Sequence, residues 1–151
     1  MAEVLGRIPT ELAAGRKALY DSQMQSSVAV FEMPSTHAGA AIADTIGSGI
    51  VLKKGARLLA PVTLSNAAGT ASCTLAVGLR DPVTKVAIDA TAILAATAIN
   101  AAQNIQATTG TKLTSGQRYV LTQDAEIYGT VAGAAIPANQ AIRVEIPYLQ
   151  A

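Results

Sequence analysis

The sequence predicts an all-β fold: an antiparallel β-sandwich or jelly-roll-like domain, preceded by an extended N-terminal arm. From Ile50 onward, apolar and polar residues alternate with a period of two, the period at which side chains of a strand share a face. About six to eight strand-like runs are separated by turn residues at the spacing that is typical of sandwiches and jelly rolls. No internal repeat of 20–50 residues is evident, which argues against a solenoid.

Two neighbouring runs show the clearest alternation. In 57–65 apolar residues stand at positions 58, 60, 62 and 64, with Leu59 as the exception to the alternation, and in 71–79 they stand at every odd position. The residues between these runs include the turn formers Asn66 and Gly69. We therefore interpret the two runs as an antiparallel β-hairpin with one buried face.

Further strands are predicted by the same alternation of apolar and polar residues. They cover residues 28–33, 86–88, 118–122, 126–131 and 142–148.

Two prolines, Pro61 and Pro147, stand within strand-like runs. Because proline has no N–H to donate to a neighbouring strand, we expect these strands to lie at a sheet edge or to be bulged there.

The alanine-rich segment 91–102 leaves two structures open. Thr91 is a suitable N-cap for a short helix, and alanine has the highest helix propensity. A buried strand has the same short apolar pattern.

The beginning of the chain differs from the rest. Residues 1–27 alternate poorly, and we assign 1–35 to an extended arm and 36–151 to the sandwich domain. We expect no secretory signal, because we find no basic stretch that is followed by an apolar core. The most apolar stretch, 86–99, is shorter than the ~20 residues of a membrane span. We expect a chain made in a cytoplasm that has no membrane partner.

The composition indicates a chain that needs partners. Of 151 residues, half are hydrophobic, but 31 of these are alanine, one is phenylalanine and none is tryptophan. Alanine buries little area, so at ~25 cal/mol per Å² the core is weak for its size. We therefore expect association, first of all with copies of the same chain. A net charge of +1 offers no electrostatic footprint for nucleic acid.

Residue types that form catalytic or metal sites are scarce. His37 is the single histidine and lies in a loop-like stretch, where a solvated side chain is a simpler interpretation than a Ser-His-Asp site. Cys73 is the single cysteine, so no intrachain disulfide forms, and it falls on the apolar face of its predicted strand. The scattered carboxylates lack metal-ligand spacing. We expect no metal and no cofactor.

Two other patterns are weak as signs of chemistry. Gly47 and Gly49 begin a G-x-G motif, but Leu52 breaks G-x-G-x-x-G, so we expect a turn before a strand at 50–52. Asp124 and Glu126 would share a strand face, but no cleft is indicated that would separate their pKa values for acid–base catalysis. The residues favour a protein that is not an enzyme.

Lys53, Lys54 and Arg57 form a basic cluster in a turn. A solvated turn is one interpretation, and contact with an acidic partner surface is the other. Without interleaved aromatic residues, the cluster is a poor platform for single-stranded nucleic acid.

Four stretches carry a resemblance to a known family. They are Val-Leu-Lys-Lys-Gly-Ala-Arg-Leu-Leu at 51–59, Ala-Ser-Cys-Thr-Leu-Ala-Val-Gly at 71–78, Ala-Glu-Ile-Tyr-Gly-Thr at 125–130 and Ile-Arg-Val-Glu-Ile-Pro-Tyr at 142–148. Over about residues 45–151, the chain resembles the capsid decoration (cement) proteins and related head proteins of tailed bacteriophages.

The resemblance implies a jelly-roll knob that assembles as a homotrimer on the outer surface of the phage head. Such a knob is made in the host cytoplasm and bridges neighbouring major capsid proteins in the virion. The arm and the basic turn would contact the capsid. The contact residues that we expect are Arg7, Arg16, Lys17, Tyr20, Lys53, Lys54 and Arg57.

Two alternative functions fit the same fold. One is another phage structural module, such as the base of a head fibre or a tail. The other is a soluble jelly-roll module that binds a glycan or another small ligand, although the absence of tryptophan counts against an aromatic sugar platform.

Overall fold

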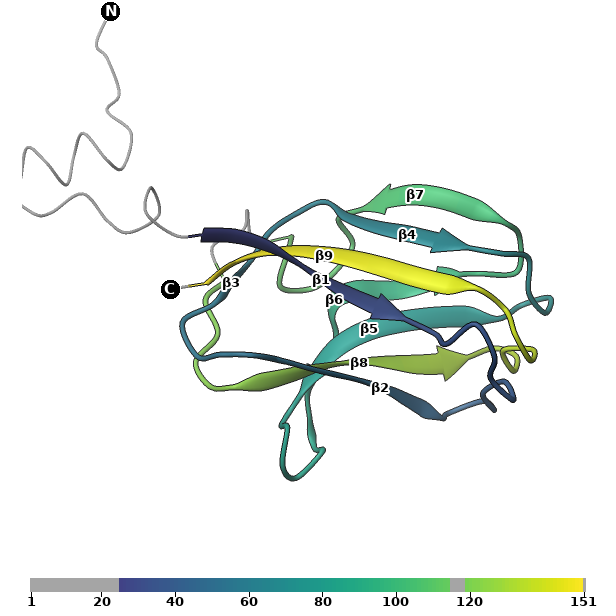
Figure 1. The fold of residues 1–151 in the computed structure, drawn as a ribbon, viewed down its shortest axis with the longest axis horizontal. Coiled ribbons are helices and arrows are strands. Elements are labelled where there is room, and N and C mark those ends of the chain that lie inside the picture. The colour runs from purple at the N-terminus through teal and green to yellow at the C-terminus, as the bar shows by residue number, and fades with distance from the viewer. Residues whose placement is uncertain (1–24, 115–118, 151) are drawn as a thin grey trace, which may run out of the picture.

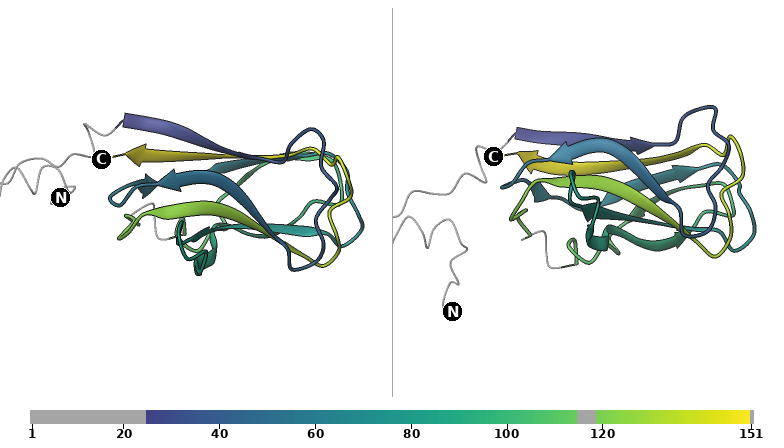
Figure 2. Two further views of the ribbon diagram at one scale, coloured as in Figure 1. Left: turned by 60° about the horizontal axis from the view of Figure 1, so that its bottom comes forward. Right: turned by 90° about the horizontal axis from the view of Figure 1, so that it is seen from below.

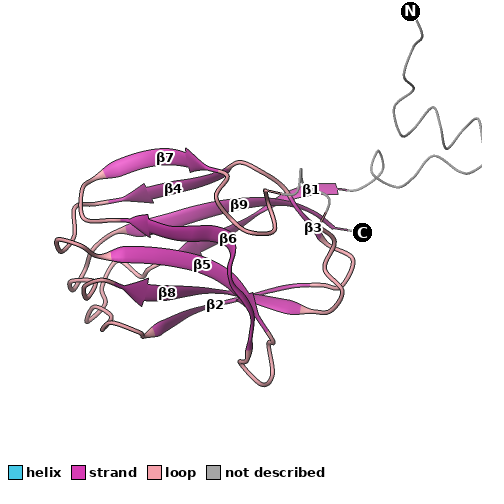
Figure 3. Cartoon of the chain, turned by 180° about the vertical axis from the view of Figure 1, so that it is seen from behind, coloured by secondary structure: helices cyan, strands magenta, loops and turns pink. Residues whose placement is uncertain are grey.

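The computed structural model describes residues 25–114 and 119–150, which form two facing antiparallel sheets (Figure 1). The five-stranded sheet holds β1 (Gln25–Glu32), β9 (Ile142–Gln150), β4 (Val62–Asn66) and β7 (Gln103–Ala107), with β3 (Arg57–Leu58) also beside β9. The four-stranded sheet holds β2 (Thr45–Leu52), β8 (Ala125–Ala132), β5 (Thr74–Arg80) and β6 (Ala87–Ala98). The two layers are seen edge-on in Figure 2, and the described residues contain no helix (Figure 3).

The strand pairing is that of a jelly roll. β1 pairs with β9, β2 with β8, β4 with β7 and β5 with β6, and successive pairs fall in alternate sheets. The chain is thus a long hairpin, with the β5–β6 turn at its tip, that is wrapped into two layers. This confirms the all-β sandwich or jelly-roll-like fold predicted from the alternation.

The core lies between the two sheets and is built from the alternating apolar positions. Leu58, Val62 and Leu64 are fully buried on one sheet, as are Leu75 and its odd-numbered neighbours on β5. The prediction of which residues point inward is therefore confirmed for 57–65 and, within 71–79, for Cys73, Leu75, Val77 and Leu79. The prediction of a single buried face in 71–79 is wrong, because Ala71 is exposed while Ala76 and Gly78 on the opposite face are buried. Ala60 packs against this core from a partly buried position.

The predicted hairpin between these two runs is wrong. β4 lies in the five-stranded sheet and β5 in the four-stranded sheet, so residues 67–73 cross from one layer to the other. Alternation reports that one face of a strand is buried. Two strands paired in one sheet and two strands facing each other across a core satisfy that pattern equally well.

The alanine-rich segment is a strand, and the helix alternative for 91–102 is wrong. β6 pairs antiparallel with β5 from Arg80↔Ala87 to Thr74↔Ala98, with several register shifts. It also includes most of the short strand predicted at 86–88. Burial of its middle, including Ile93 and Leu94, and pairing with a central strand outweigh the helix propensity of alanine.

The predictions for the last third of the chain have mixed outcomes. The strands at 126–131 and 142–148 are confirmed as β8 and β9. In the predicted strand 118–122, the described residues 119–122 make one isolated bridge, Val120↔Arg57. This pairing does not extend into a longer ladder, because β3, which contains Arg57, is only two residues long.

The expectation that the two prolines mark edges or bulges is wrong for β9. Pro147 lies in an interior strand with unbroken register to β1, and β3 and β4 flank its other side. Its carbonyl accepts a hydrogen bond from Leu59 N at 2.9 Å, so its missing N–H faces the break between β3 and β4. Pro61 lies in that break, after a cis peptide bond, and not in a strand.

Two boundaries also differ from expectation. Gly47 and Gly49 lie inside β2, where the register shifts between Gly47 and Val51, rather than in a turn before it. The predicted strand 28–33 is confirmed as β1, which means that the sandwich includes residues assigned to the 1–35 arm. Residues 1–24 of that arm lie outside the described residues.

Candidate functional site

The predicted basic turn lies at the end of the sandwich where β1 begins and β9 ends (Figure 1). Gln25 pairs with Gln150, and Arg57 of β3 pairs with the adjacent Leu149. The fold therefore brings Lys53 and Lys54, which lie between β2 and β3, to the same end as the point where residues 1–24 join the domain. The other expected contact residues, Arg7, Arg16, Lys17 and Tyr20, lie outside the described residues.

Asp124 binds this turn, a contact that the sequence analysis did not foresee. Its carboxylate accepts hydrogen bonds from Lys53 Nζ and from the backbone N–H of Lys54, both at 2.9 Å. These two bonds lower the pKa of Asp124. Because 70 residues separate the partners, no local pattern identifies the contact. The ion pair is exposed and offsets part of the positive charge of the turn.

A buried ion network occupies the outer face of the four-stranded sheet. Arg80 binds the carboxylate of Glu126 at two points, Nη2–Oε1 at 2.9 Å and Nε–Oε2 at 3.0 Å. Lys85 Nζ reaches the same carboxylate at 2.6 Å. The hydrogen bonds from Arg80 and then Lys85 lower the pKa of Glu126 to about 2, against the opposing effect of burial. A carboxylate held ionised in this way is a structural anion and not a general acid.

Gly47 of the G-x-G motif makes room for this ion network. A Cβ atom added to Gly47 would lie 2.6 Å from Arg80 Nη2 and 3.2 Å from Glu126 Oε1, so glycine leaves the space that the ion pair fills. Asp124, which precedes β8, binds the basic turn instead of joining Glu126. The two carboxylates therefore act at separate places.

The turn between β5 and β6 projects from the body of the sandwich (Figures 1 and 3). The Asp81 side chain accepts hydrogen bonds from the N–H groups of Val83 and Thr84, and Lys85 ties the turn to Glu126. Val83 is 85% exposed, and Val86 is also exposed. The turn is thus an ordered projection with apolar side chains at its surface.

His37 and Cys73 have structural surroundings. His37 is half-buried and not simply solvated: Nδ1 accepts from Gly39 N–H, so Nε2 carries the proton and donates to Gln140 O at 3.0 Å. Cys73 is fully buried on the inward face, as predicted, and burial raises the pKa of its thiol. These surroundings give both residues a structural role, and neither of them indicates a catalytic role.

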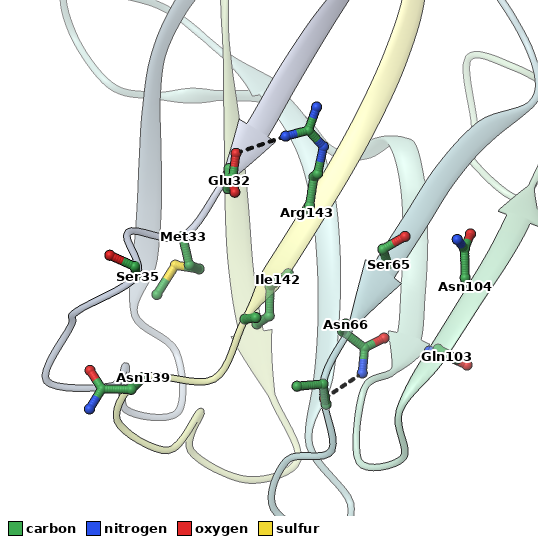
Figure 4. A pocket seen from close by; sticks show the side chains of 12 residues that line it. Glu32, Met33, Ser35, Ser65, Asn66, Gln103, Asn104, Asn139, Ile142 and Arg143 are labelled. Atoms are coloured by element: carbon green, nitrogen blue, oxygen red, sulfur yellow. Dashed lines mark hydrogen bonds and ion pairs between the residues drawn. The ribbon is translucent and has the colours of Figure 1, made fainter.

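A pocket of about 520 Å³ opens at the opposite end of the five-stranded sheet, where β1 and β4 end and β7 and β9 begin (Figure 4). Six of its twelve lining residues carry amide or hydroxyl side chains, and Met33 and Ile142 are apolar members. The Glu32–Arg143 ion pair, 3.1 Å, also lines it. The lining residues are Glu32, Met33, Ser35, Ser65, Asn66, Ala67, Gln103, Asn104, Asn139, Ala141, Ile142 and Arg143.

Two searches for other kinds of site were negative in residues 25–114 and 119–150. No three or more His, Cys, Asp or Glu residues of this part lie together as a metal site would require. Nor does this part contain a helix of the length and apolarity needed to cross a membrane.

No protein-family model matches this chain, and no curated protein matches it. Among solved structures, it is similar to a chain in the capsid of Ralstonia phage GP4, with a TM-score of 0.64 and 20% identity over 84% of this chain and 85% of that one. It is also similar to a chain in the capsid asymmetric unit of cyanophage Pam1, with a TM-score of 0.59 and 20% identity over 85% and 86%. The chain thus shares its jelly-roll fold, over most of its length, with chains found in two phage capsid structures.

Proposed function

We propose that this protein is a structural component of a phage virion: a capsid decoration protein that binds the outer surface of the head as a homotrimer. In this role it stabilises contacts between major capsid proteins and carries out no catalysis. The observation that carries the proposal is the fold shared with chains of two phage capsids over 84–85% of this chain. The proposal involves no nucleic acid, membrane or cofactor.

The position of the basic turn supports this proposal. Lys53, Lys54 and Arg57 lie at the end of the sandwich where residues 1–24 join β1. One end of the domain can therefore present both the arm and the turn to a shell. Three arms on one trimer would bind with a high effective concentration, so that modest contacts give lasting attachment.

Binding to purified heads that lack the protein tests the proposal. A chain without residues 1–22 keeps all of β1, which begins at Gln25, and removes Arg7, Arg16, Lys17 and Tyr20. We expect its occupancy at sub-saturating concentration to fall by roughly tenfold or more, because avidity through three arms is lost. Full occupancy by the truncated chain would contradict the role of the arm, and failure of the intact chain to bind heads would overturn the proposal.

A charge variant tests the turn by itself. Lys54→Gln removes one positive charge at the proposed contact, and Arg143→Gln removes one at the opposite end of β9. We expect Lys54→Gln to weaken binding to heads and Arg143→Gln to leave it unchanged. Equal binding by the two variants would mean that the basic turn is solvated and does not contact the head.

A different position in the virion is the first alternative, because a head-fibre or tail base could use the same fold. Electron microscopy of virions with and without the protein distinguishes these roles. Density missing across the head surface supports decoration, and density missing at one vertex or on the tail supports the alternative.

The pocket favours a second candidate function, the binding of a glycan or another neutral polar ligand. Its amide and hydroxyl groups match sugar hydroxyls, and Asn104 and Gln103 lie together at its β7 side (Figure 4). A glycan array, with Asn104→Leu as the control variant, tests this function. Binding that disappears in the variant, in a stable monomer, would favour the ligand-binding module over decoration.

A further inference from the structure

The two sheets have four outer strands, and three of them carry features that discourage pairing with another chain. β7 is only five residues long. β2 is interrupted by a register shift between Gly47 and Val51, and Gly49 there has a φ of +71°. β6 has several register shifts and is covered at its middle, where Thr111 N–H and Lys112 N–H donate to Thr91 O and Ala92 O. Short length, bulges and coverage are the usual ways in which sheet edges avoid association.

Within residues 25–114 and 119–150, the fourth outer strand, β1, shows none of these features. It is eight residues long, Gln-Ser-Ser-Val-Ala-Val-Phe-Glu, and its register with β9 is unbroken from Gln25↔Gln150 to Glu32↔Arg143. It contains no proline, and its one charged residue is Glu32 at its end. An edge of this kind is a template for a further strand.

The backbone groups that face this open edge follow from Pro147. Pro147 lies opposite Val28, has no N–H, and turns its carbonyl to Leu59 and away from β1. Val28 therefore does not share backbone hydrogen bonds with β9, and its N–H and C=O point to the open edge. Since these directions alternate along a strand, the same holds for Ser26, Val30 and Glu32. Within the described residues, no hydrogen bond satisfies these outward groups.

The side chains of these same residues form the outer face of β1. Val28 is 57% exposed and Val30 is half-buried. Glu32, at the far end, is held by Arg143 at 3.1 Å. The edge is thus apolar in its middle, neutral at Ser26 and negative at Glu32.

We propose that β1 pairs with β1 of a second copy of this chain, antiparallel about a two-fold axis. With Val28 opposite Val30 of the other copy, Ser26 lies opposite Glu32, and all four outward-facing residues find a partner. This register packs valine beside valine and lets a serine hydroxyl donate to a carboxylate, whereas a parallel arrangement would place Glu32 beside Glu32. The five-stranded sheets of the two copies become one continuous sheet.

This pairing goes beyond the proposed decoration function and does not depend on a shell. It is a two-fold contact, so it is separate from the proposed three-fold association. If both exist, the β1 contacts join two trimers into a closed hexamer.

A proline substitution in β1 tests the backbone pairing. Val28→Pro removes a donor that faces the open edge and none that bonds to β9, whereas Val28→Thr keeps the N–H and a similar shape. We expect the wild type and Val28→Thr to have a mass in solution that is an even multiple of the 15.3 kDa chain. Val28→Pro should have half that mass with native circular dichroism. A wild type that is a monomer or a plain trimer at every concentration, or a folded Val28→Pro of unchanged mass, would overturn the proposal.

A charge pair at Ser26 tests the register and needs no proline. Ser26→Glu places a second carboxylate opposite Glu32 of the other copy, and Ser26→Lys places an ammonium group there. We expect the dissociation constant between copies to rise about 2- to 30-fold in Ser26→Glu and to fall by a similar factor in Ser26→Lys, since two equivalent pairs form per contact. Equal constants for the two variants would contradict the register. Binding of Val28→Pro to purified heads distinguishes this proposal from decoration, because the proline removes the contact between copies and leaves the arm and basic turn in place.

Discussion

Arg80 and Glu126 lie directly opposite each other on β5 and β8 and form a two-point ion pair with side chains only 11% and 4% exposed. The Arg80 guanidinium also lies over the Tyr128 ring, 5.2 Å from its centroid. Lys85 joins the pair from the projecting β5–β6 turn. The Glu126 carboxylate thus connects β5 and β8, the two inner strands of the four-stranded sheet, to the β5–β6 turn.

Removing the charge of Glu126 is expected to destabilise the fold strongly. Glu126→Gln leaves Arg80 buried without its anion, and loss of one partner of a buried pair costs about 3 kcal/mol or more. Urea unfolding measures the free-energy change. Asp124→Asn is the control, because its pair with Lys53 is exposed and we expect a much smaller effect. Equal losses in the two variants would show that burial does not strengthen the Arg80 pair.

The same carboxylate makes stability depend on acid pH. The folded-state pKa of Glu126 is about 2, below its ordinary value of 4.5, so the unfolded chain binds the proton more tightly. The stabilisation is complete above pH 4.5 and decreases as the pH falls towards 2. Unfolding free energies of the wild type and Glu126→Gln should therefore converge between pH 4.5 and 2. A difference that stays constant over this range would contradict the ionised pair.

Asn66 and Gln140 hold together the loops at the pocket end. Asn66 Nδ2 donates to the carbonyls of Ala67, Ile99 and Ala101, and Gln140 Nε2 donates to the first two of these. We expect Asn66→Ala to cost about 1–3 kcal/mol, because it removes the donor to the Ala101 carbonyl and leaves the carbonyls of Ala67 and Ile99 with Gln140 alone.

An isosteric change at the same position gives a sharper test. Asn66→Asp replaces the donor by an oxygen that faces three carbonyl oxygens, so it should destabilise the fold more than Asn66→Ala at pH 7. Thermal unfolding by circular dichroism compares the two. An aspartate variant as stable as the alanine variant would mean that the amide donor is not what matters at residue 66.

Gly129 permits the two sheets to approach each other at Phe31. A Cβ atom at Gly129 would lie 2.8 Å from Phe31 Cζ and 3.2 Å from Leu75 Cδ1. We expect Gly129→Ala to cost about 1–3 kcal/mol by overpacking. The second change Phe31→Leu should recover part of this loss, which a double-mutant cycle from urea unfolding would measure. Strictly additive losses would show that the alanine does not clash with the ring.

The sequence correctly predicted most of the side chains that are buried along a strand. Its wrong predictions mainly concern which strands lie beside each other. Leu75, Val77 and Ile146 are buried at the positions where a period of two places them. The same pattern wrongly joined 57–65 to 71–79, because it contains no information on which strand lies alongside. It also could not decide between helix and strand for 91–102, where the pairing of β6 with β5 is the determining interaction.

The candidate contact residues divide in the same way. Lys53, Lys54 and Arg57 are close in sequence, so composition alone marks them as a basic turn. Their placement beside the root of residues 1–24 and their contact with Asp124 depend on β1, β3 and β9 meeting at one end. The open edge of β1 is likewise visible only once the strand order is known.

By itself, the sequence determined that this is an all-β chain, which residues face its core, and that catalytic residue types are scarce, because these follow from local periodicity and composition. Only the tertiary structure decided the jelly-roll order, the buried Arg80–Glu126 pair and the edge at β1. These are contacts between residues tens of positions apart, and their energy comes from burial and pairing that exist only when the two sheets close.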